Sequence, residues 1–332
     1  MFTQLQGLHM PPEWEEHRGM LMEWPVSDCV WGDGIKAARL AFARVAEAIA
    51  RFEPVTMIVN EALAEEARTL CPEKVALLTL PHDDCWMRDN GPTFVKDRDG
   101  ALAAVNWRFN AWGGIFPNCA LDNLVPERLC EVLGVPRVDA PLILEGGSIH
   151  VNGQGLVLTT EECLLNPNRN PKLSKAEIEG HLLHYLGAKK VIWLPYGLYA
   201  DETSGHVDNI CCFIGPTTVL LLWTNDPTHP NYERFRQAEE ILTANGLAVE
   251  KIPEPPLHNH NGKPLPLSYV NFVFVNGGVI LPAFGKEAEK ADKAAAQTLR
   301  RLFPQREIVQ LPTLDIVKGG GNIHCITQQI PL

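Results

Sequence analysis

One order of elements, two short strands followed by a helix and a third strand, recurs four times along this sequence of 332 residues. The strands show as short apolar runs, and the helices as apolar residues spaced three and four apart. The strand pairs read PTFVK and ALAAVNWRF, SIHVN and GLVLTT, HVDNICCFI and TVLLLW, and YVNFVFV and GVILPA. Helices follow near 121–134, 175–186, 231–245 and 286–302, with closing strands near 137–144, VIWL, LAVEKI and EIVQL. We expect such repeated units to pack against one another.

A fifth unit can be completed only by joining the two chain ends. Its strands would be NIHCITQQ (322–329), GMLMEWP (19–25) and PVTMIVN (54–60). Its helix is expected over 35–52, where Phe42, Val45 and Ile49 lie on one apolar face. The sequence therefore predicts an α/β fold of five pseudo-fivefold strand-strand-helix-strand units, in a ring that the chain termini close.

Unusual polar residues fall at or just before the first strand of each unit. The stretches are DDCWMRDNGP (83–92), LEGGSIHV (144–151), ETSGHVDN (202–209), SYVNFVF (268–274) and GGGNIHC (319–325). In a ring of similar units, equivalent positions converge on the central axis, so we expect one central pocket there. The residues expected in it are Asp83, Asp84, Asp89, Glu145, His206, Asp208 and Cys325.

Each of these residues also has a plain structural explanation. Asp84 and Asp89 could serve as turn and cap residues, and EGG as a tight turn. His206 could be a core histidine with satisfied hydrogen bonds, and Cys325 a small buried apolar side chain. Any one of them alone favours that explanation. Their shared position in successive units favours a joint site.

The residue types of this pocket indicate a particular chemistry. A cysteine near a histidine can ionise to a thiolate, which is a strong nucleophile, and the histidine can carry protons. Carboxylates around an anionic nucleophile repel it unless a cation normally lies between them. A planar guanidinium group fits two carboxylates with paired hydrogen bonds. The pocket therefore favours a guanidinium substrate whose central carbon faces the sulfur, with loss of ammonia and hydrolysis of the amidino-thioether.

Composition excludes several other classes of protein. The formal net charge of −11 argues against nucleic acid as a partner, because phosphate-binding surfaces carry clustered Lys and Arg. The nine cysteines are scattered without a C-x-x-C pair, which argues against a zinc site or redox dithiol and suits a reducing cytosol. No signal peptide, membrane-length apolar run or linker interrupts the chain. We expect a cytoplasmic protein without a membrane partner, and a single catalytic domain over 1–332.

Seven motifs together resemble the agmatine deiminase family, which is grouped with bacterial peptidyl-arginine deiminases. They are MPPEWEEHRGMLMEWP, DDCWMRDNGPTFV, NAWGG, EGGSIHVNG, ETSGHVDN, SYVNFVFVNGGVILPAFG and GGGNIHCITQQ, and they span nearly the whole chain. The resemblance implies the pentein fold, a five-bladed α/β propeller. It also implies hydrolysis of agmatine to N-carbamoylputrescine and ammonia in putrescine and polyamine biosynthesis. Neither a metal nor an organic cofactor is implied.

The family pattern also implies a role for single residues. Cys325 becomes the nucleophile that forms the amidino intermediate, and His206 the general acid and base. Asp89 and Asp208 become the carboxylates that bind the guanidinium group, while Glu145 orients His206 and favours its protonated form. For the substrate arm, the pattern implies packing of Trp86 against its methylenes and a contact of Glu202 with its distal amine.

Other interpretations stay open at this point. A cysteine peptidase also uses Cys and His, although it needs an oxyanion hole more than carboxylates. A binder of guanidino compounds without catalysis would keep the acids but would have no need of the thiol. Peptidyl-arginine is the second choice of substrate and free arginine the third, and a homo-oligomer stays possible in principle. His258 and His260, in the loop LHNHNGKPLP, are expected to be solvated.

Overall fold

The computed structural model describes residues 7–26 and 28–332, and its main strands form separate sheets that each correspond to one predicted unit. In the first unit, β4 (Thr93–Lys96) pairs antiparallel with β5 (Leu102–Arg108), and β5 pairs parallel with β6 (Arg137–Ile143). The antiparallel pair needs only a short turn. The parallel pair needs a longer crossover, which contains the helix α6 (Val125–Leu133).

Three further units repeat this arrangement. Their elements are β7 (Ile149–Val151), β8 (Leu156–Thr160), α8 (Lys175–Leu186) and β9 (Lys190–Leu194); β10 (Cys211–Gly215), β11 (Thr218–Trp223), α9 (Tyr232–Ala244) and β12 (Ala248–Pro253); and β15 (Val273–Val275), β16 (Gly278–Ala283), α10 (Glu289–Leu302) and β17 (Glu307–Pro312). In each unit the first pair of strands is antiparallel and the second is parallel. The order of elements is the one that the sequence predicts.

The chain ends meet in the fifth sheet. There β18 (Thr327–Pro331) pairs antiparallel with β1 (His17–Glu23), and β1 pairs parallel with β2 (Val55–Val59) after the helix α2 (Ile35–Ile49). This pairing of the termini was predicted. The helix α3 (Ala64–Leu70) and the fourth strand β3 (Ala76–Thr79), which extend the same sheet, were not.

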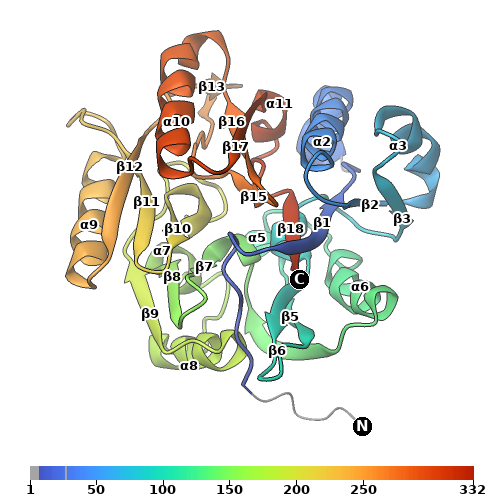
Figure 1. The fold of residues 1–332 in the computed structure, drawn as a ribbon, viewed down its shortest axis with the longest axis horizontal. Coiled ribbons are helices and arrows are strands. Elements are labelled where there is room, and N and C mark those ends of the chain that lie inside the picture. Colours follow the sequence, from blue (N-terminus) through green and yellow to red (C-terminus); the bar gives the residue numbers. More distant parts are fainter. Residues whose placement is uncertain (1–6, 27) are drawn as a thin grey trace.

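Figure 1 shows the long helices on the periphery and the first strands of the units toward the middle. The hydrogen-bonded ladders stop at the edge of each unit, so no sheet among the described strands closes on itself. The structure is thus a mixed α/β fold of five similar sheets. The N-terminal and C-terminal strands, β1 and β18, pair with each other inside the fifth sheet.

Short elements occupy the connections between the strands. They include α1 (Asp28–Trp31), α4 (Met87–Asn90), α5 (Ala111–Gly114), α7 (Glu161–Leu164), α11 (Leu314–Val317) and the small hairpin β13 (Asn259–His260) and β14 (Lys263–Pro264). Several helices are shorter than the sequence predicts. Residues 286–288 form a 3-10 turn before α10, and α2 ends at Ile49, five residues before Pro54.

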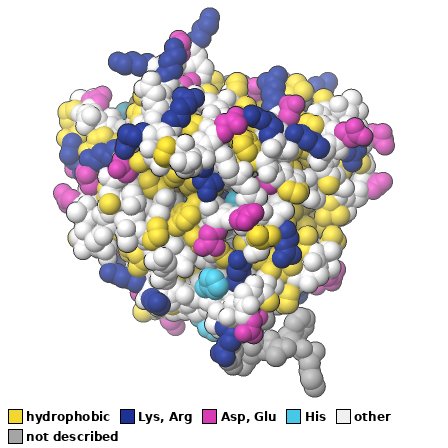
Figure 2. All heavy atoms as spheres, in the orientation of Figure 1, with side chains coloured by type: hydrophobic (Ala, Val, Ile, Leu, Met, Phe, Trp, Pro, Cys, Tyr) yellow, Lys and Arg dark blue, Asp and Glu magenta, His cyan; other side chains and the backbone are white. Residues whose placement is uncertain are grey.

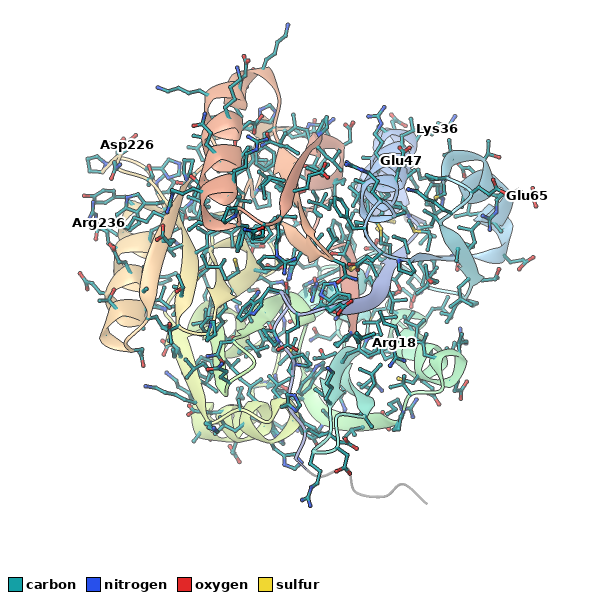
Figure 3. All side chains as sticks on the ribbon, viewed as in Figure 1. Arg18, Lys36, Glu47, Glu65, Asp226 and Arg236 are labelled. Atoms are coloured by element: carbon teal, nitrogen blue, oxygen red, sulfur yellow. The ribbon has the colours of Figure 1, made fainter. Side chains whose placement is uncertain are left out.

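The core lies between each helix and its sheet. On α2 the predicted apolar face is buried, with Phe42 and Ile49 fully enclosed against the fifth sheet. Charged side chains on the outer elements, including Lys36, Glu65 and Asp226, project from the rim in Figure 3. On the face drawn in Figure 2, basic and acidic side chains are interspersed, with no continuous basic stripe. None of the described helices combines the length and apolar character that a membrane span requires.

Candidate active site

The residues that the sequence predicts to be catalytic all lie in turns that precede the first strand of a unit. They are Asp89 in α4, Glu145 before the 3-10 turn Gly146–Ser148, His206 and Asp208 at the 3-10 turn Val207–Asn209, and Cys325 before β18. All five side chains are buried. Because the units are arranged around the middle of the molecule, these turns meet there, as the sequence analysis expects.

The thiol of Cys325 lies among hydrogen-bonding and acidic groups. Its Sγ is 3.1 Å from Nδ2 of Asn271 and 3.6 Å from Oδ2 of Asp208. Burial raises the pKa of the thiol well above its usual value, and the charges of Asp208 and Asp89 raise it further. The thiol is therefore protonated at neutral pH when no cation lies beside it.

The glycine run before Cys325 allows the chain to pass through a crowded space. A Cβ on Gly321 would lie 2.4 Å from the Trp86 ring, and one on Gly319 would lie 2.3 Å from Trp31. At Gly320, which has φ +108°, a Cβ would lie 2.4 Å from a carboxylate oxygen of Glu202. The three glycines thus let the backbone contact the pocket wall directly.

His206 lies between two carboxylates. Its Nδ1 is 3.9 Å from Oδ1 of Asp89, and its Nε2 is 3.7 Å from Oε2 of Glu145. Both distances exceed hydrogen-bond length, and both ring nitrogens are buried without a hydrogen-bond partner. Burial lowers the pKa of His206, but the charge of Asp89 and the contacts with Cys163 and Glu145 outweigh it and raise the pKa well above the ordinary value. The imidazole is therefore a proton donor at neutral pH.

Gly147 separates these groups. A Cβ on this residue would lie 2.7 Å from Nδ1 of His206, 2.8 Å from Oδ2 of Asp208 and 2.9 Å from Oδ1 of Asp89. The glycine of the EGG motif therefore leaves free the point where one imidazole and two carboxylates meet. The backbone N–H of Gly147 also donates to Oδ1 of Asp89 at 3.0 Å.

Asp89 is fixed by a residue that the sequence analysis did not assign. Nε1 of Trp112, in the NAWGG motif, donates to Oδ2 of Asp89 at 2.9 Å. Burial raises the pKa of Asp89 to about 6, although the charge of His206 partly opposes this. Ala111 and Trp112 have positive φ values of 52° and 54°, followed by two glycines, and this left-handed run turns the indole toward Asp89. The paired glycines were the only sequence signal for this conformation.

Glu145 has a second unforeseen partner. Nε of Arg169 donates to Oε1 of Glu145 at 2.7 Å, and both side chains are fully buried. Burial opposes ionisation of Glu145, but the interactions with His206 and Arg169 are stronger and lower its pKa. The other oxygen, Oε2, has no hydrogen-bond partner. Arg169 lies in a loop of polar residues, NPNRNPK, where nothing in the sequence marks it as buried.

Cys163 is a further thiol close to the site. Its sulfur, a ring nitrogen of His206 and a carboxylate oxygen of Glu145 all lie within 4.8 Å of one another. Burial raises the pKa of Cys163, so the thiol is neutral beside the imidazole. Nothing in the sequence marks this cysteine, because the EECLL segment that contains it resembles an ordinary helix start.

A pocket of about 330 Å³ leads from Cys325 toward the surface. Besides Cys325 and Asp89, it is lined by Trp86, Trp112, Ile115, Phe116, Glu202, Thr203 and Gly319 to Gly321. Trp86 stacks on Trp31 and meets Trp112 edge to face, so one wall is aromatic. Burial raises the pKa of Glu202, the charge of Asp201 adds to this effect, and the charge of Lys263 partly opposes it. The predicted residues Trp86 and Glu202 thus line the same pocket as Cys325.

The expectation that Asp83 and Asp84 join the central pocket is wrong. Oδ2 of Asp83 accepts the backbone N–H of Leu121 at 2.8 Å, and Oδ1 of Asp84 accepts that of Cys85 at 2.8 Å. The backbone N–H groups of both acids donate to Oδ1 of Asp122. They lie in the connection between β3 and α4, where these hydrogen bonds hold them against the segment of Leu121 and Asp122. For Asp84, the plain structural explanation of a residue that supports a turn fits these contacts.

The two histidines of the predicted solvated loop lie far from metal-ligand geometry. His258 pairs with Glu287 at 3.3 Å, a residue with a 78% exposed side chain, and His260 is next to Asn261 in the β13–β14 hairpin. Within the described residues, neither histidine belongs to a group of three possible metal ligands. The absence of a metal from the reaction stays a prediction.

Comparison with known proteins identifies the family. The family model of Porphyromonas-type peptidyl-arginine deiminase matches residues 9–331. A putative agmatine deiminase of Legionella pneumophila is 46% identical over 333 residues, covering 98% of this chain and 95% of the relative. The agmatine deiminase of Medicago truncatula is 45% identical over 363 residues, covering 98% of this chain and 96% of the relative. The solved agmatine deiminase of Enterococcus faecalis superimposes with a TM-score of 0.94 at 37% identity, covering 98% and 96% of the two chains. The chain belongs to the Porphyromonas-type peptidyl-arginine deiminase family and lies there among proteins named agmatine deiminases.

Proposed function

We propose that this chain hydrolyses the guanidinium group of agmatine to N-carbamoylputrescine and ammonia through a covalent intermediate on Cys325. The observation that carries the proposal is the buried thiol of Cys325 beside two carboxylates, Asp89 and Asp208, with His206 next to them. A guanidinium cation supplies the paired N–H donors and the positive charge that such a pocket lacks. The names of relatives at 45% and 46% identity support agmatine as the substrate.

Binding of the substrate also activates the nucleophile. Burial and the two aspartates keep Cys325 protonated, as described above. A guanidinium cation beside the sulfur reverses the electrostatic effect of the aspartates and lowers the pKa of the thiol. The thiol then releases its proton to solvent, so the thiolate forms where its target carbon is already held, and it is scarce in the empty enzyme.

The reaction then has two stages. In the first, the thiolate of Cys325 attacks the guanidinium carbon, the bond from that carbon to a terminal nitrogen breaks, and protonated His206 gives its proton to the leaving ammonia. In the second, neutral His206 takes a proton from water, whose oxygen attacks the amidino carbon. The C–S bond breaks, the thiolate is restored, and the remaining hydroxyl proton passes to solvent. The product carries C=O where the substrate carried C=NH₂⁺.

Glu145 serves this cycle through His206. Its Oε2 faces Nε2 of the imidazole, while Arg169 holds its other oxygen. We assign to Glu145 the orientation of His206 and the support of its protonated form. The neutral thiol of Cys163 also lies beside the imidazole ring of His206.

The pocket favours agmatine over arginine. Trp86 and the neighbouring aromatic rings suit the methylene arm, and Glu202 is placed to meet the distal ammonium. Arg88, the one motif cation that could hold an α-carboxylate, is buried in an ion pair with Glu13. No lysine or arginine belongs to the described residues that line this inner pocket, so arginine and peptidyl-arginine are not favoured.

The same proposal covers the molecule as a whole. We assign the five units to the blades of the pentein propeller, and residues 1–332 to a single catalytic domain. The reaction needs neither a metal nor an organic cofactor, since Cys325 and His206 supply the nucleophile and the proton carrier. The nine cysteines are free, which suits a reducing cytoplasm.

Ammonia release from a panel of guanidino compounds tests the function. The panel contains agmatine, arginine, an arginyl peptide and guanidinobutyrate, and kcat/KM is measured for each. We expect a strong preference for agmatine. Comparable values for agmatine and arginine would overturn the substrate assignment, and release from none of them would overturn the deiminase chemistry.

A further inference from the structure

A second buried cluster of ionisable groups lies against Asp208, outside the substrate pocket. Nδ1 of His324 is 2.8 Å from Oδ2 of Asp208, the same oxygen that is 3.6 Å from the Cys325 sulfur. On its other side, Nε2 of His324 is 2.9 Å and 3.1 Å from the two carboxylate oxygens of Glu13. All three residues are at most 4% exposed, and a chain of hydrogen bonds links Glu13, His324 and Asp208.

The remaining groups around His324 anchor this chain to the fold. Nη1 of Arg88 is 3.2 Å from Oε1 of Glu13, and its Nη2 donates to Gln329 in β18. Nε2 of His150 is 3.6 Å from Oε2 of Glu13, and the His150 and His324 rings stack. Cys212 is the other titratable side chain that lines this small cavity. The carboxylate of Glu13 is therefore held from three sides.

A protonated imidazole fits both neighbours of His324. An imidazolium ring has two N–H donors, whereas a neutral ring has one donor and would leave either Asp208 or Glu13 without its hydrogen bond. Burial and the charge of Arg88 lower the pKa of His324, but Glu13 and Asp208 outweigh them and raise it. The pKa of Glu13 is well below its usual range despite its burial, because His324 and Arg88 stabilise its charge.

We propose that His324, held by Glu13, is a positioning residue for the deiminase reaction, because it fixes one oxygen of Asp208 and leaves the other for the guanidinium group. The second oxygen, Oδ1 of Asp208, is buried without a hydrogen-bond partner, as an acceptor reserved for a cation would be. This inference rests on the proposed function of Asp208.

A pair of substitutions separates positioning from packing. The side-chain amide of His324→Asn can occupy the place of Nδ1 and still donate to Asp208. That of His324→Gln reaches the place of Nε2, so it can donate to Glu13 but not to Asp208. Glutamine is the closer match to histidine in volume, so a role in packing alone predicts that Gln is tolerated at least as well as Asn.

Agmatine binding and turnover are measured for both variants. Binding is followed by calorimetry in the Cys325→Ser background, where no reaction occurs, and turnover by ammonia release with Cys325 intact. We expect His324→Gln to weaken agmatine binding and to lower kcat/KM by about tenfold or more, and His324→Asn to recover most of both. Equal behaviour of the two variants, or better function with Gln, would overturn the positioning role.

A pH profile supplies an independent measurement. Glu13→Gln removes the negative charge that favours protonated His324, so the ring should lose its proton at a lower pH. We expect the alkaline limb of kcat/KM for agmatine to move toward lower pH, while His206 and its neighbours Asp89 and Glu145 are untouched. An unchanged alkaline limb would contradict the proposal. This measurement remains available as the test if either variant at position 324 does not fold.

Failure of the proposed function gives a different pattern. If the unmodified chain neither binds agmatine nor releases ammonia from it, the function itself is wrong. If the unmodified chain does both and the variants show no difference, the function stands and the role of His324 falls.

Discussion

Two buried charged clusters meet at Asp208, and they differ in how completely their polar atoms are paired. In the cluster of Glu13, Arg88, His150 and His324, each charged group contacts a partner of opposite charge or a hydrogen-bond acceptor within 3.6 Å. In the cluster around Cys325, both ring nitrogens of His206, Oε2 of Glu145 and Oδ1 of Asp208 are buried without hydrogen-bond partners.

The difference indicates what each cluster contributes. Buried polar atoms are nearly always paired, because an unpaired one loses its contacts with water and gains nothing in return. The paired cluster can therefore stabilise and orient its neighbours in the empty protein. The acceptor atoms of the unpaired cluster gain hydrogen-bond partners only when a cation with several N–H donors enters it, which fits a reaction site.

The largest effect is expected at the nucleophile. Cys325→Ala should lower kcat for agmatine by about 10⁴-fold or more, because no other thiol in the pocket can attack the substrate. The melting temperature should change little, since the thiol makes only weak contacts. Retained ammonia release would remove Cys325 from the mechanism. A large loss of stability would show that the unpaired cluster also supports the fold.

A matched pair of ion-pair variants tests the stability of the paired cluster. Arg88→Met should lower the free energy of unfolding by about 3–5 kcal/mol, because it leaves Glu13 buried without its guanidinium partner. Arg51→Met breaks the exposed pair with Glu307, whose side chain is 54% exposed, and should cost about 1 kcal/mol or less. Urea unfolding measures both, and similar losses would contradict the distinction between buried and exposed pairs.

Neutralising either carboxylate beside Cys325 should lower the activity strongly. Asp89→Asn and Asp208→Asn should each raise the barrier for agmatine hydrolysis by about 2–5 kcal/mol, measured as kcat/KM. Near-normal kcat/KM in either variant would place that residue outside the substrate contacts.

The pH dependence of stability sharpens this prediction for Asp89. Its pKa is raised to about 6 in the folded protein, so the ionised carboxylate destabilises the native state once the pH exceeds its unfolded pKa of about 4. Stability of Asp89→Asn relative to the parent should therefore improve as the pH rises from about 4 to above 6. A relative stability that falls over this range would show that the charge of His206 governs the site instead.

Alkylation of Cys325 reports on its protonation. Because burial and the two aspartates raise the pKa of the thiol, iodoacetamide should inactivate the empty enzyme slowly at neutral pH, about tenfold faster per unit of rising pH. EDTA should leave activity intact. A rate independent of pH between 7 and about 9 would show that the thiolate already exists without substrate.

The smallest effect is expected at the outer end of the pocket. Glu202→Gln should raise KM for agmatine by a factor of about ten or less and change kcat little, because the distal ammonium is held equally in the ground and transition states. Thr203→Val, which alters the same wall without removing a charge, is the control. A fall in kcat with unchanged KM would place Glu202 nearer to the reaction than we propose.

The periodic features of the sequence predicted most of the fold. Apolar alternation located the strands, and the spacing of residues such as Phe42 and Ile49 located the helices, because both patterns are local. The short helix α3 and the strand β3 were missed, since β3 is only four residues long and partly exposed, so its apolar signal is weak.

The residue pattern by itself predicted the chemistry of the site, from the thiol of Cys325, the imidazole of His206 and the repeated position of Asp89, Glu145 and Asp208. It could not decide which acids reach the centre, and it wrongly included Asp83 and Asp84. It also gave no sign of Arg169 or Cys163, and it indicated no role for Trp112, Glu13 and His324, which lie within recognised motifs. Only the tertiary structure decides such partners, because pairing and burial depend on contacts between residues as far apart as 13 and 324, whose separation along the chain leaves no local pattern.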